Sequence, residues 1–489
     1  MLKTGAEHLE SLRDGRAVFV GGERVKDVTT HPAFRNGAQS IADIYDMKAA
    51  SENRDLLTYE ENGKRYSGYF LQARSKDDLA FRYGVHRAIA DKTYGMFGRS
   101  PDHVSSFVTG MSLAPNVFGK YADNLTGYYE HMRNNDVYAV YAVIPPQAGR
   151  NPEPYKKLNI PVPTLRVVRE DDDGVVISGQ KMLATGAVYA NEIWIGNITP
   201  LAPDQAEQSI TCAIPCNAPG LEMWSRKPMG REAKSDFESP LGNRYDESDS
   251  MLLCNEVKVP WEKVFVHNDS TLARQIYVET AGHTYGNHQS NVRFHSKLEL
   301  IVGLASKVAK ASGADQIPAV RETLGKLAAW EAMLQGAILG QIQGAEEWPS
   351  QGHWCFNRRV VYAALNWCTE NHSIIIDQLR ELCGGSVFQM PADISVMADP
   401  VLRASFEKYW TTPQNAAVDR MKLYKLAWDL TGSEFAGRHQ QYEKFYAGAS
   451  FVVRNYNFMH TDWSAMEGVA ERLLSSYGVP SEYSNAEAA

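Results

Sequence analysis

Residues 171–198 read DDDGVVISGQKMLATGAVYANEIWIGNI, and they set the fold class of the chain. An Asp-rich turn ending in Gly174 precedes the β-branched run GVVISG, and a second strand-like run, EIWIGNI, ends the stretch. The sequence therefore predicts a small antiparallel β domain over residues 137–270. Comparable runs within it occupy residues 137–144, 164–170, 209–214, 250–257 and 263–266.

Helical periodicity flanks this β domain on both sides. Apolar residues recur at three- and four-residue spacing before it, in residues 77–98 and 102–135, and again after it, from about residue 271 to residue 477. Helices, then strands, then helices are typical of an α+β protein. The predicted domains are an N-terminal helical domain (1–136), the β domain (137–270) and a C-terminal helical domain (271–489).

Composition narrows the classes of function. The 489 residues are 44% hydrophobic and 22% charged, and 50 Lys+Arg against 58 Asp+Glu give a formal net charge of −8. This balance, without a basic block, disfavours nucleic-acid binding. Apolar runs such as residues 137–146 are shorter than the ~18–20 residues of a membrane span, and the polar N-terminus lacks the apolar core of a signal peptide. We therefore expect a cytoplasmic protein.

Several chemical fingerprints are missing from the sequence. It contains no GxGxxG behind a strand, no GxxxxGK[ST], no HExxH and no GxSxG. The six cysteines begin only at Cys212 and form no CxxC, and the spacing of His283, His288 and His295 does not place three imidazoles on one helical face. We expect reduced thiols and no metal site.

Four polar segments interrupt apolar surroundings: residues 99–103 (RSPDH), 145–150 (PPQAGR), 184–186 (ATG) and 383–386 (CGGS). Each also suits an ordinary helix cap or turn. From the residues alone the prediction stops at a large α+β enzyme.

Longer motifs run in order over most of the chain. They are ERVKDVTTHPAFRN (23–36), LTYEENGKRYSGYFL (57–71), YGMFGRSPD (94–102), IPPQAGR (144–150), SGQKMLATGAVYANE (178–192), EVKVPWEKVFV (256–266), GG (384–385) and LAWDLTGSEFAGRHQQYEKFYAG (426–448). Together they resemble the oxygenase component of two-component, reduced-flavin-dependent aromatic hydroxylases, the 4-hydroxyphenylacetate 3-monooxygenase family.

The resemblance implies an acyl-CoA dehydrogenase-like fold whose C-terminal part is a four-helix bundle, assembled as a homotetramer. It implies FAD between the β domain and the bundle, supplied as FADH2 by a separate NAD(P)H–flavin reductase, with O2 as co-substrate. The expected reaction is hydroxylation of a small phenolic or related aromatic substrate through a flavin C4a-hydroperoxide. Two alternatives within the family are a non-phenolic heteroaromatic acid as substrate and a phenol that loses a halogen or nitro group.

Site residues follow from the resemblance position by position. The expected flavin contacts are Tyr141, Gln147, Ala148, Gly149, Arg150, Thr185, Gly384, Gly385, Ala449, Ser450 and Arg454. The expected substrate contacts are Arg99, Ser100, His103, Tyr141, Ile198 and Thr199, with residues 200–209 as a lid. The expected catalytic residues are Arg99, His103, Tyr141 and His288.

Two of these positions depart from the family pattern. The family has Tyr in the Arg99 loop and His on the first strand of the β domain, whereas this chain has His103 and Tyr141. The exchange keeps one cation, one imidazole and one phenol but puts hydroxyphenylacetate itself in doubt. We expect His103 to act as a base or hydrogen-bond acceptor, Arg99 to stabilise an anion and Tyr141 to orient the ring; a capping role for His103 is the alternative. His288 is expected to line the pocket or relay a proton, or else to be a buried structural histidine.

Three other functions fit the sequence less well. 4-Hydroxybutyryl-CoA dehydratase, which carries an iron–sulfur cluster, would require cysteines in the region of residues 98–102, and the chain has none before Cys212. An acyl-CoA dehydrogenase would require a catalytic carboxylate, and the hydroxylase motifs argue against this function. A non-catalytic flavin-storage protein would not require Arg99, Arg150 and Thr185, so the presence of these residues argues against it.

Overall fold

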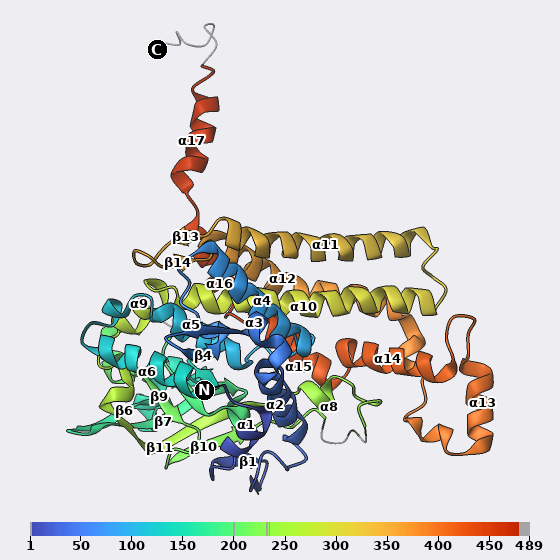
Figure 1. Ribbon diagram of the computed structural model, residues 1–489, viewed down its shortest axis with the longest axis horizontal. Coiled ribbons are helices and arrows are strands. Elements are labelled where there is room, and N and C mark those ends of the chain that lie inside the picture. Colours follow the sequence, from blue (N-terminus) through green and yellow to red (C-terminus); the bar gives the residue numbers. More distant parts are fainter. Residues whose placement is uncertain (1, 199–200, 231–232, 234, 479–489) are drawn as a thin grey trace.

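The computed structural model describes residues 2–198, 201–230, 233 and 235–478. Figure 1 shows the strands gathered on one side of the molecule and a set of long helices extending beside them. The longest helices are α10 (Gly282–Ala311), α11 (Pro318–Gln343) and α12 (Arg358–Cys383). Two more, α14 (Ala417–Thr431) and α15 (Glu434–Lys444), pack against α12. The chain thus runs from helices through strands to helices, in agreement with the predicted α+β class.

The strands form two main sheets. The six-stranded sheet has the order β2-β1-β10-β11-β7-β6, and the four-stranded sheet has the order β12-β9-β8-β5. Their bounds are β1 (Ala17–Val20), β2 (Glu23–Val25), β5 (Ala139–Ala142), β6 (Arg166–Asp171), β7 (Gly174–Thr185), β8 (Glu192–Ile195), β9 (Thr211–Pro215), β10 (Leu221–Ser225), β11 (Asp249–Pro260) and β12 (Val264–Val266). At the predicted β6–β7 turn Gly174 has φ 153°, and a Cβ there would lie 2.1 Å from the Val259 carbonyl oxygen. Only glycine fits this turn.

Two features of the sheets differ from the predicted β domain. β1 and β2 come from the region predicted to be helical, and they complete the six-stranded sheet. The β1–β10 and β5–β8 pairs are parallel, whereas the other pairs of the two sheets are antiparallel as predicted. The β1–β10 pair joins segments about 200 residues apart, so no local pattern announces it.

The helices of the first third of the chain cover the sheets and the start of α10. They include α2 (Arg35–Ala49), α4 (Lys76–Lys92), α5 (Pro101–Met111) and α6 (Ala122–Asn135). α5 begins with Pro101 in its first turn, where the missing N–H is not needed. It packs against α10 and β5, and all of its 11 residues are buried. Polar side chains of α5 therefore lie in the protein interior, where they require partners.

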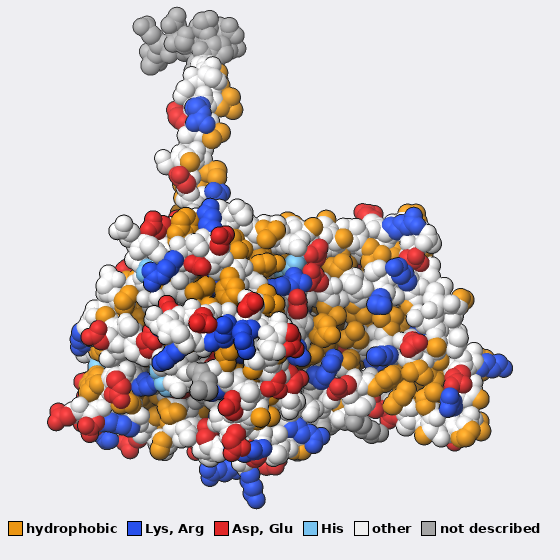
Figure 2. Space-filling model, viewed as in Figure 1, with side chains coloured by type: hydrophobic (Ala, Val, Ile, Leu, Met, Phe, Trp, Pro, Cys, Tyr) orange, Lys and Arg blue, Asp and Glu red, His pale blue; other side chains and the backbone are white. Residues whose placement is uncertain are grey.

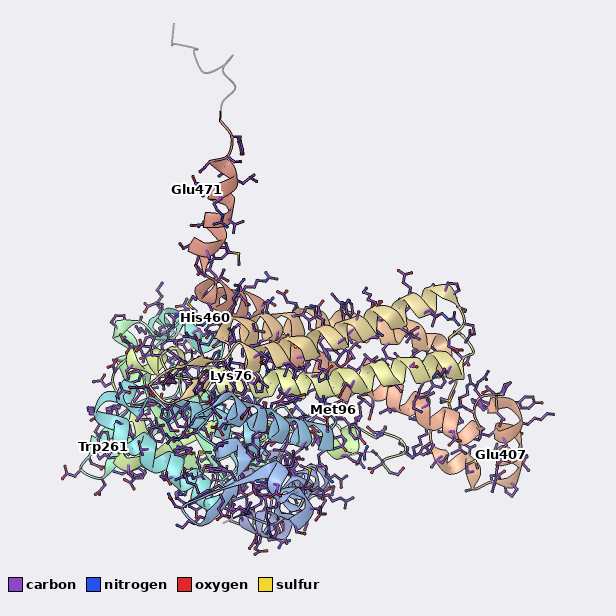
Figure 3. All side chains as sticks on the ribbon, turned by 45° about the horizontal axis from the view of Figure 1, so that its top comes forward. Lys76, Met96, Trp261, Glu407, His460 and Glu471 are labelled. Atoms are coloured by element: carbon purple, nitrogen blue, oxygen red, sulfur yellow. The ribbon has the colours of Figure 1, made fainter. Side chains whose placement is uncertain are left out.

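The C-terminal helices leave the body of the protein. α16 (Ser450–His460) packs on α12, and α17 (Trp463–Leu474) projects away from all other elements in Figures 1 and 2. Figure 3 shows His460 at the base of this projection and Glu471 within it. Within the part of the chain that the structure describes, no helix is both long enough and apolar enough to cross a membrane.

Candidate active site

Arg99 lies just before α5 and contacts His103, one helical turn further on. One guanidinium nitrogen donates to Nε2 of His103 over 3.0 Å, and another donates to the Tyr446 carbonyl over 3.0 Å. The guanidinium carbon lies 4.1 Å from the centre of the Tyr446 ring, a cation–π contact. Because arginine only donates hydrogen bonds, Nε2 of His103 must carry the lone pair and Nδ1 the proton.

Aromatic side chains surround this pair. The rings of His103 and Tyr141 are perpendicular with centres 5.7 Å apart, and Phe107 lies 5.1 Å from His103 and 4.7 Å from Tyr141. Among the described residues, Nδ1 of His103 and the Tyr141 hydroxyl are buried without a hydrogen-bond partner. Buried polar atoms are normally paired. These two unpaired atoms therefore mark a place for the polar atom of a ligand.

Burial keeps both of these side chains neutral. Desolvation, and after it the Arg99 cation, hold the pKa of His103 well below its ordinary value of 6.5. Desolvation also raises the pKa of Tyr141 well above 10. Near neutral pH the site thus presents an N–H donor, an O–H group and the charge of Arg99. The side-chain hydrogen bonds of Arg99 go to a ring nitrogen and a carbonyl, neither of which neutralises that charge.

This geometry bears on the expected role of His103 as a base or hydrogen-bond acceptor, which stays a prediction. Its acceptor nitrogen is already bound by Arg99, and its other nitrogen carries a proton. His103 is therefore a hydrogen-bond donor toward a ligand. The site suits an oxygen anion, which donors and a cation stabilise.

Residues 147–150, expected to bind flavin, form a short turn after β5. Gln147, Ala148 and Arg150 are exposed, whereas Gly149 is buried. A Cβ on Gly149 would lie 2.6 Å from Oγ1 of Thr164, so the turn packs against the protein through bare backbone. The exposed Arg150 side chain on this turn suits the pyrophosphate of FAD, which Arg binds in a bidentate manner.

Thr185 ends β7 close to the loop that carries Arg99. Its hydroxyl donates to Asp249 over 2.7 Å, and the adjacent Gly186 N–H donates to the Ser248 carbonyl over 3.1 Å. The pKa of Asp249 is held well below its ordinary range; burial opposes ionisation, but ion pairs with Arg438 and Arg226 outweigh it. The turn is thus rigidly anchored, which is what a contact to a cofactor ring requires.

Family models match almost the whole chain. The model described as "4-hydroxyphenylacetate 3-hydroxylase N terminal" covers residues 4–266, and the corresponding C-terminal model covers residues 273–475. The chain belongs to this hydroxylase family. Membership confirms the resemblance and the prediction of a flavin-dependent aromatic monooxygenase that uses FAD and O2, with an aromatic substrate and a separate reductase.

Individual relatives of the hydroxylase align over nearly their full length. A pyoverdin chromophore biosynthetic protein of Pseudomonas aeruginosa is 33% identical, covering 98% of this chain and 96% of that protein. The oxygenase component of a 4-nitrophenol 2-monooxygenase of Rhodococcus sp is 32% identical, covering 97% of this chain and 92% of that protein. The solved oxygenase component of 4-hydroxyphenylacetate 3-monooxygenase, complexed with FAD and 4-hydroxyphenylacetate, has a TM-score of 0.91 at 28% identity, covering 97% of this chain and 98% of that chain.

The remaining expected flavin residues of the hydroxylase lie in two places. Ala449 and Ser450, at the start of α16, closely follow Tyr446 and so lie near Arg99. Gly384 and Gly385 lie beyond the far end of α12, about 33 Å from Tyr362 at 1.5 Å per residue. Both glycines are exposed, and nothing lies within 4 Å of a Cβ built on either. Arg454 is exposed and pairs with Glu370 over 2.5 Å.

Other expected contacts lie outside the Arg99 site. The Ser100 hydroxyl donates to Asp102 over 2.5 Å and so secures the start of α5. Ile198 is half-buried, while Thr199 and Pro200, the start of the expected lid, lie outside the described residues. His288 stacks on Phe356 with ring centres 3.6 Å apart and bonds to Gln341 over 2.7 Å. Its Nε2 is buried without a hydrogen-bond partner among the described residues, so both expected roles, pocket or relay residue and structural histidine, stay predictions.

Two site residues were missed in the sequence. His283, left without a role, lies 6.0 Å from Phe107 between ring centres and bonds to the Tyr362 hydroxyl over 2.8 Å, and burial lowers its pKa to about 4. Tyr446 closes the site over Arg99. Only the tertiary fold brings residues 283 and 446 to α5, although Tyr446 falls inside the FYAG end of a recognised motif.

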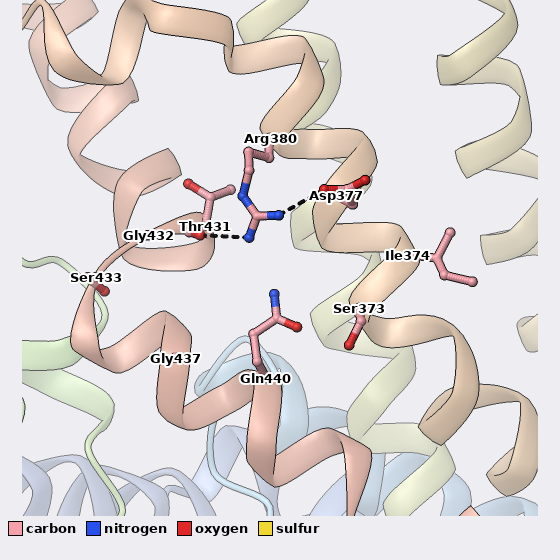
Figure 4. A pocket seen from close by; sticks show the side chains of 9 residues that line it. All are labelled: Ser373, Ile374, Asp377, Arg380, Thr431, Gly432, Ser433, Gly437 and Gln440. Atoms are coloured by element: carbon pink, nitrogen blue, oxygen red, sulfur yellow. Dashed lines mark hydrogen bonds and ion pairs between the residues drawn. The ribbon is translucent and has the colours of Figure 1, made fainter.

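A separate groove of about 540 Å³ lies on the helical bundle (Figure 4). Arg380 points toward it, held by Asp377 and the Thr431 carbonyl, and Gln440 faces it from α15. The groove lies between α12 and the α14–α15 junction and contains none of the Arg99 site residues.

Proposed function

We propose that this hydroxylase binds its phenol as the phenolate anion and hydroxylates the ring with FADH2 from the separate reductase and O2. The observation that carries the proposal is the half-buried Arg99 charge beside two unpaired groups, His103 Nδ1–H and the Tyr141 hydroxyl. A neutral phenol would leave that charge uncompensated in the interior, whereas a phenolate compensates it.

The residues of the chain would act as follows. His103 Nδ1–H and the Tyr141 hydroxyl would hold the phenolate oxygen, and Arg99, bound to the opposite nitrogen of the imidazole, would add its positive charge through His103. Together they would keep electron density on the ring, which favours attack at the ortho carbon. Phe107 and Tyr446 enclose the ring and exclude water. When bound, reduced FAD supplies the activation of O2. Because Tyr141 is only half-buried, the site opens on its side.

Residues 147–150, Thr185, Ala449 and Ser450 would hold the flavin of the same subunit. Gly384 and Gly385 lie about 33 Å along α12 from Tyr362, which borders the Arg99 site through His283, and would contact the flavin of a second subunit. The exposed α17 supports the same conclusion, since its apolar side chains have no cover within the described chain. We propose the homotetramer as the assembly that satisfies both features.

The substrate class is an acidic phenol. Relatives named for 4-hydroxyphenylacetate and 4-nitrophenol support a para-substituted phenol. An electron-withdrawing substituent increases the share of phenolate at neutral pH and therefore suits a site built of donors. The proposal also covers a reaction in which this substituent is lost during hydroxylation.

Single-turnover assays test this function. The purified chain receives chemically reduced FAD, air-saturated buffer and either 4-nitrophenol or 4-hydroxyphenylacetate, and hydroxylated product and hydrogen peroxide are both quantified. We expect product with little peroxide, and tighter binding of 4-nitrophenol than of 4-nitroanisole, which cannot ionise. Stoichiometric peroxide without product from any phenol tested would overturn the proposal.

A further inference from the structure

The segment Asp246–Asp249 (DESD) separates two structural elements and contacts both halves of the site. It follows the short helix α8 (Gly242–Tyr245) and leads into β11. Glu247 is only 2% exposed, which for a carboxylate requires strong partners. The residues around Glu247 indicate a role that none of the sequence motifs suggested.

One carboxylate oxygen of Glu247 reaches the Arg99 loop. It accepts the backbone N–H of Arg99 over 2.7 Å. The backbone carbonyl of Arg99 accepts a hydrogen bond from the Tyr138 hydroxyl over 2.5 Å. Both polar groups of the Arg99 main chain are therefore fixed from the β region, so the guanidinium starts from an immobile base.

The other carboxylate oxygen of Glu247 reaches the Thr185 turn through one side chain. It pairs with Arg438 over 2.9 Å, and Arg438 also donates to both oxygens of Asp249, over 2.8 and 3.0 Å. Asp249 in turn accepts the Thr185 hydroxyl over 2.7 Å. The Ser248 carbonyl adds the bond to Gly186 described above. A buried, fully connected polar network of this kind fixes geometry.

We infer that Glu247 is a positioning residue that holds the phenol-binding Arg99 loop in register with the flavin-binding Thr185 turn. The inference rests on the proposed function, because it assigns phenol to one end of the network and flavin to the other. Transfer of an oxygen atom from one bound molecule to another depends on their separation, and a misplacement of 1 Å lowers such rates about 100-fold. Glu247 touches neither molecule; it sets their relative placement.

Two substitutions separate the charge of Glu247 from its reach. Glu247→Gln keeps the length but loses the ion pair with Arg438, and Glu247→Asp keeps the charge but withdraws from the Arg99 N–H. Asp136→Asn is the matched control, because Asp136 is an equally buried carboxylate, 1% exposed, whose partners are Lys48, Ser67 and Tyr69. If the Gln variant does not fold, the Asp variant carries the test.

We expect both Glu247 variants to form about tenfold less product per O2 consumed, the remainder appearing as peroxide, with a smaller change in reduced-FAD affinity. Hydrogen exchange should accelerate in residues 94–103 and 184–190 together. Asp136→Asn should lower thermal stability and leave product yield and both segments unchanged. Wild-type exchange in residues 94–103 of the Glu247 variants, or equal uncoupling in Asp136→Asn, would overturn the inference. Absence of product in the wild type would instead count against the proposed function, and the exchange experiment would still test the network.

Discussion

Arg99 combines a half-buried position with an incomplete set of partners. The buried side chains of Arg293 and Arg438 each have a carboxylate partner, Glu443 and Glu247 respectively, whereas the guanidinium of Arg99 binds an imidazole and a carbonyl. A partly buried cation whose guanidinium pairs with no carboxylate destabilises the folded protein. A bound anion removes this penalty, so the same feature that weakens the free enzyme strengthens its complex with a phenolate.

Replacing Arg99 by Gln tests this charge directly. The amide can still donate to His103, but the cation is lost. We expect the Kd of 4-nitrophenol to rise about 10- to 100-fold, since a hydrogen bond to a charged group contributes roughly 1.5–3 kcal/mol. Absorbance titrations between pH 6 and 8 should show wild-type affinity rising as the phenol ionises, and this pH dependence should vanish in the variant. Unchanged affinity in Arg99→Gln would contradict the assigned role.

At the scale of elements, the α5–α10 contact determines the shape of the pocket. α10 meets α5 through Gly282 and Gly286, and a Cβ on Gly286 would lie 1.7 Å from Cε2 of Phe107. The Phe107 ring in turn packs on His103 and Tyr141. Because Gly286 has no side chain, the Phe107 ring can lie against α10, and this position determines how far the ring extends toward His103 and Tyr141.

Gly286→Ala should move Phe107 into the site. We expect the free energy of unfolding to fall by about 1–3 kcal/mol, the usual effect of overpacking, and phenol affinity to fall with it. Gly303→Ala on the same helix is the control, because Gly303 is exposed with nothing within 4 Å of its Cβ. That change should stabilise the protein by about 0.5–1 kcal/mol. Denaturant titrations measure the free energy of unfolding of both variants. An unchanged free energy of unfolding in Gly286→Ala would show that α5 moves to accommodate the added methyl group.

The isolated helix α17 has an apolar stripe at three- and four-residue spacing. Trp463, Met466, Val469 and Leu473 are 46%, 45%, 59% and 67% exposed. Such a stripe on a projecting helix is typical of a helix that packs on another chain.

Substituting Trp463 and Leu473 together by Ser should reduce the mass of the assembly. We expect light scattering to show a smaller oligomer than for the wild type, with the monomer fold kept because neither side chain is buried in it. Glu471→Gln, on the opposite side of the helix, should leave the mass unchanged. A double variant of wild-type mass would exclude α17 from the interface.

At the scale of the whole molecule, buried neutral histidines determine acid stability. Burial lowers the pKa of His283 to about 4 and that of His372 to about 3. The unfolded chain binds protons at these residues near pH 6.5, so their stabilising effect is full above that pH and is lost as pH falls toward the folded pKa.

Between pH 7 and pH 5, each of these two histidines should lower the free energy of unfolding by about 2 kcal/mol. Denaturant titrations at several pH values measure the slope. His372→Gln should remove about one proton from the uptake on unfolding at pH 5. A free energy of unfolding that is constant from pH 7 to pH 5 would contradict the assigned neutral state.

Much of the architecture was predictable because periodicity is local. The predicted sequence of helices, strands and helices and the turn at Gly174 follow from spacing within a few residues. The β1–β10 and β5–β8 pairs do not, because parallel pairing over long separations leaves no mark on either strand. The resemblance brought Arg99, His103 and Tyr141 together correctly. It could not reveal which His103 nitrogen carries the proton, since that depends on where Arg99 points. Glu247 was not predicted as a site residue because its sequence neighbours indicate only a polar turn.

The parallel pairing of β1 with β10 also constrains how the chain is made. Val18 and Val20 pair with Met223 and Ser225, so β1 leaves the ribosome some 200 residues before its partner. At 5–20 residues per second the delay is about 10–40 s. Throughout that interval β1 has only the short neighbouring strand β2 as a partner, while the α2 and α4 helices behind it are already able to form. The first strand of the protein is therefore among the last to be incorporated, and biosynthesis must keep it from other unpaired strands until the middle of the chain has emerged.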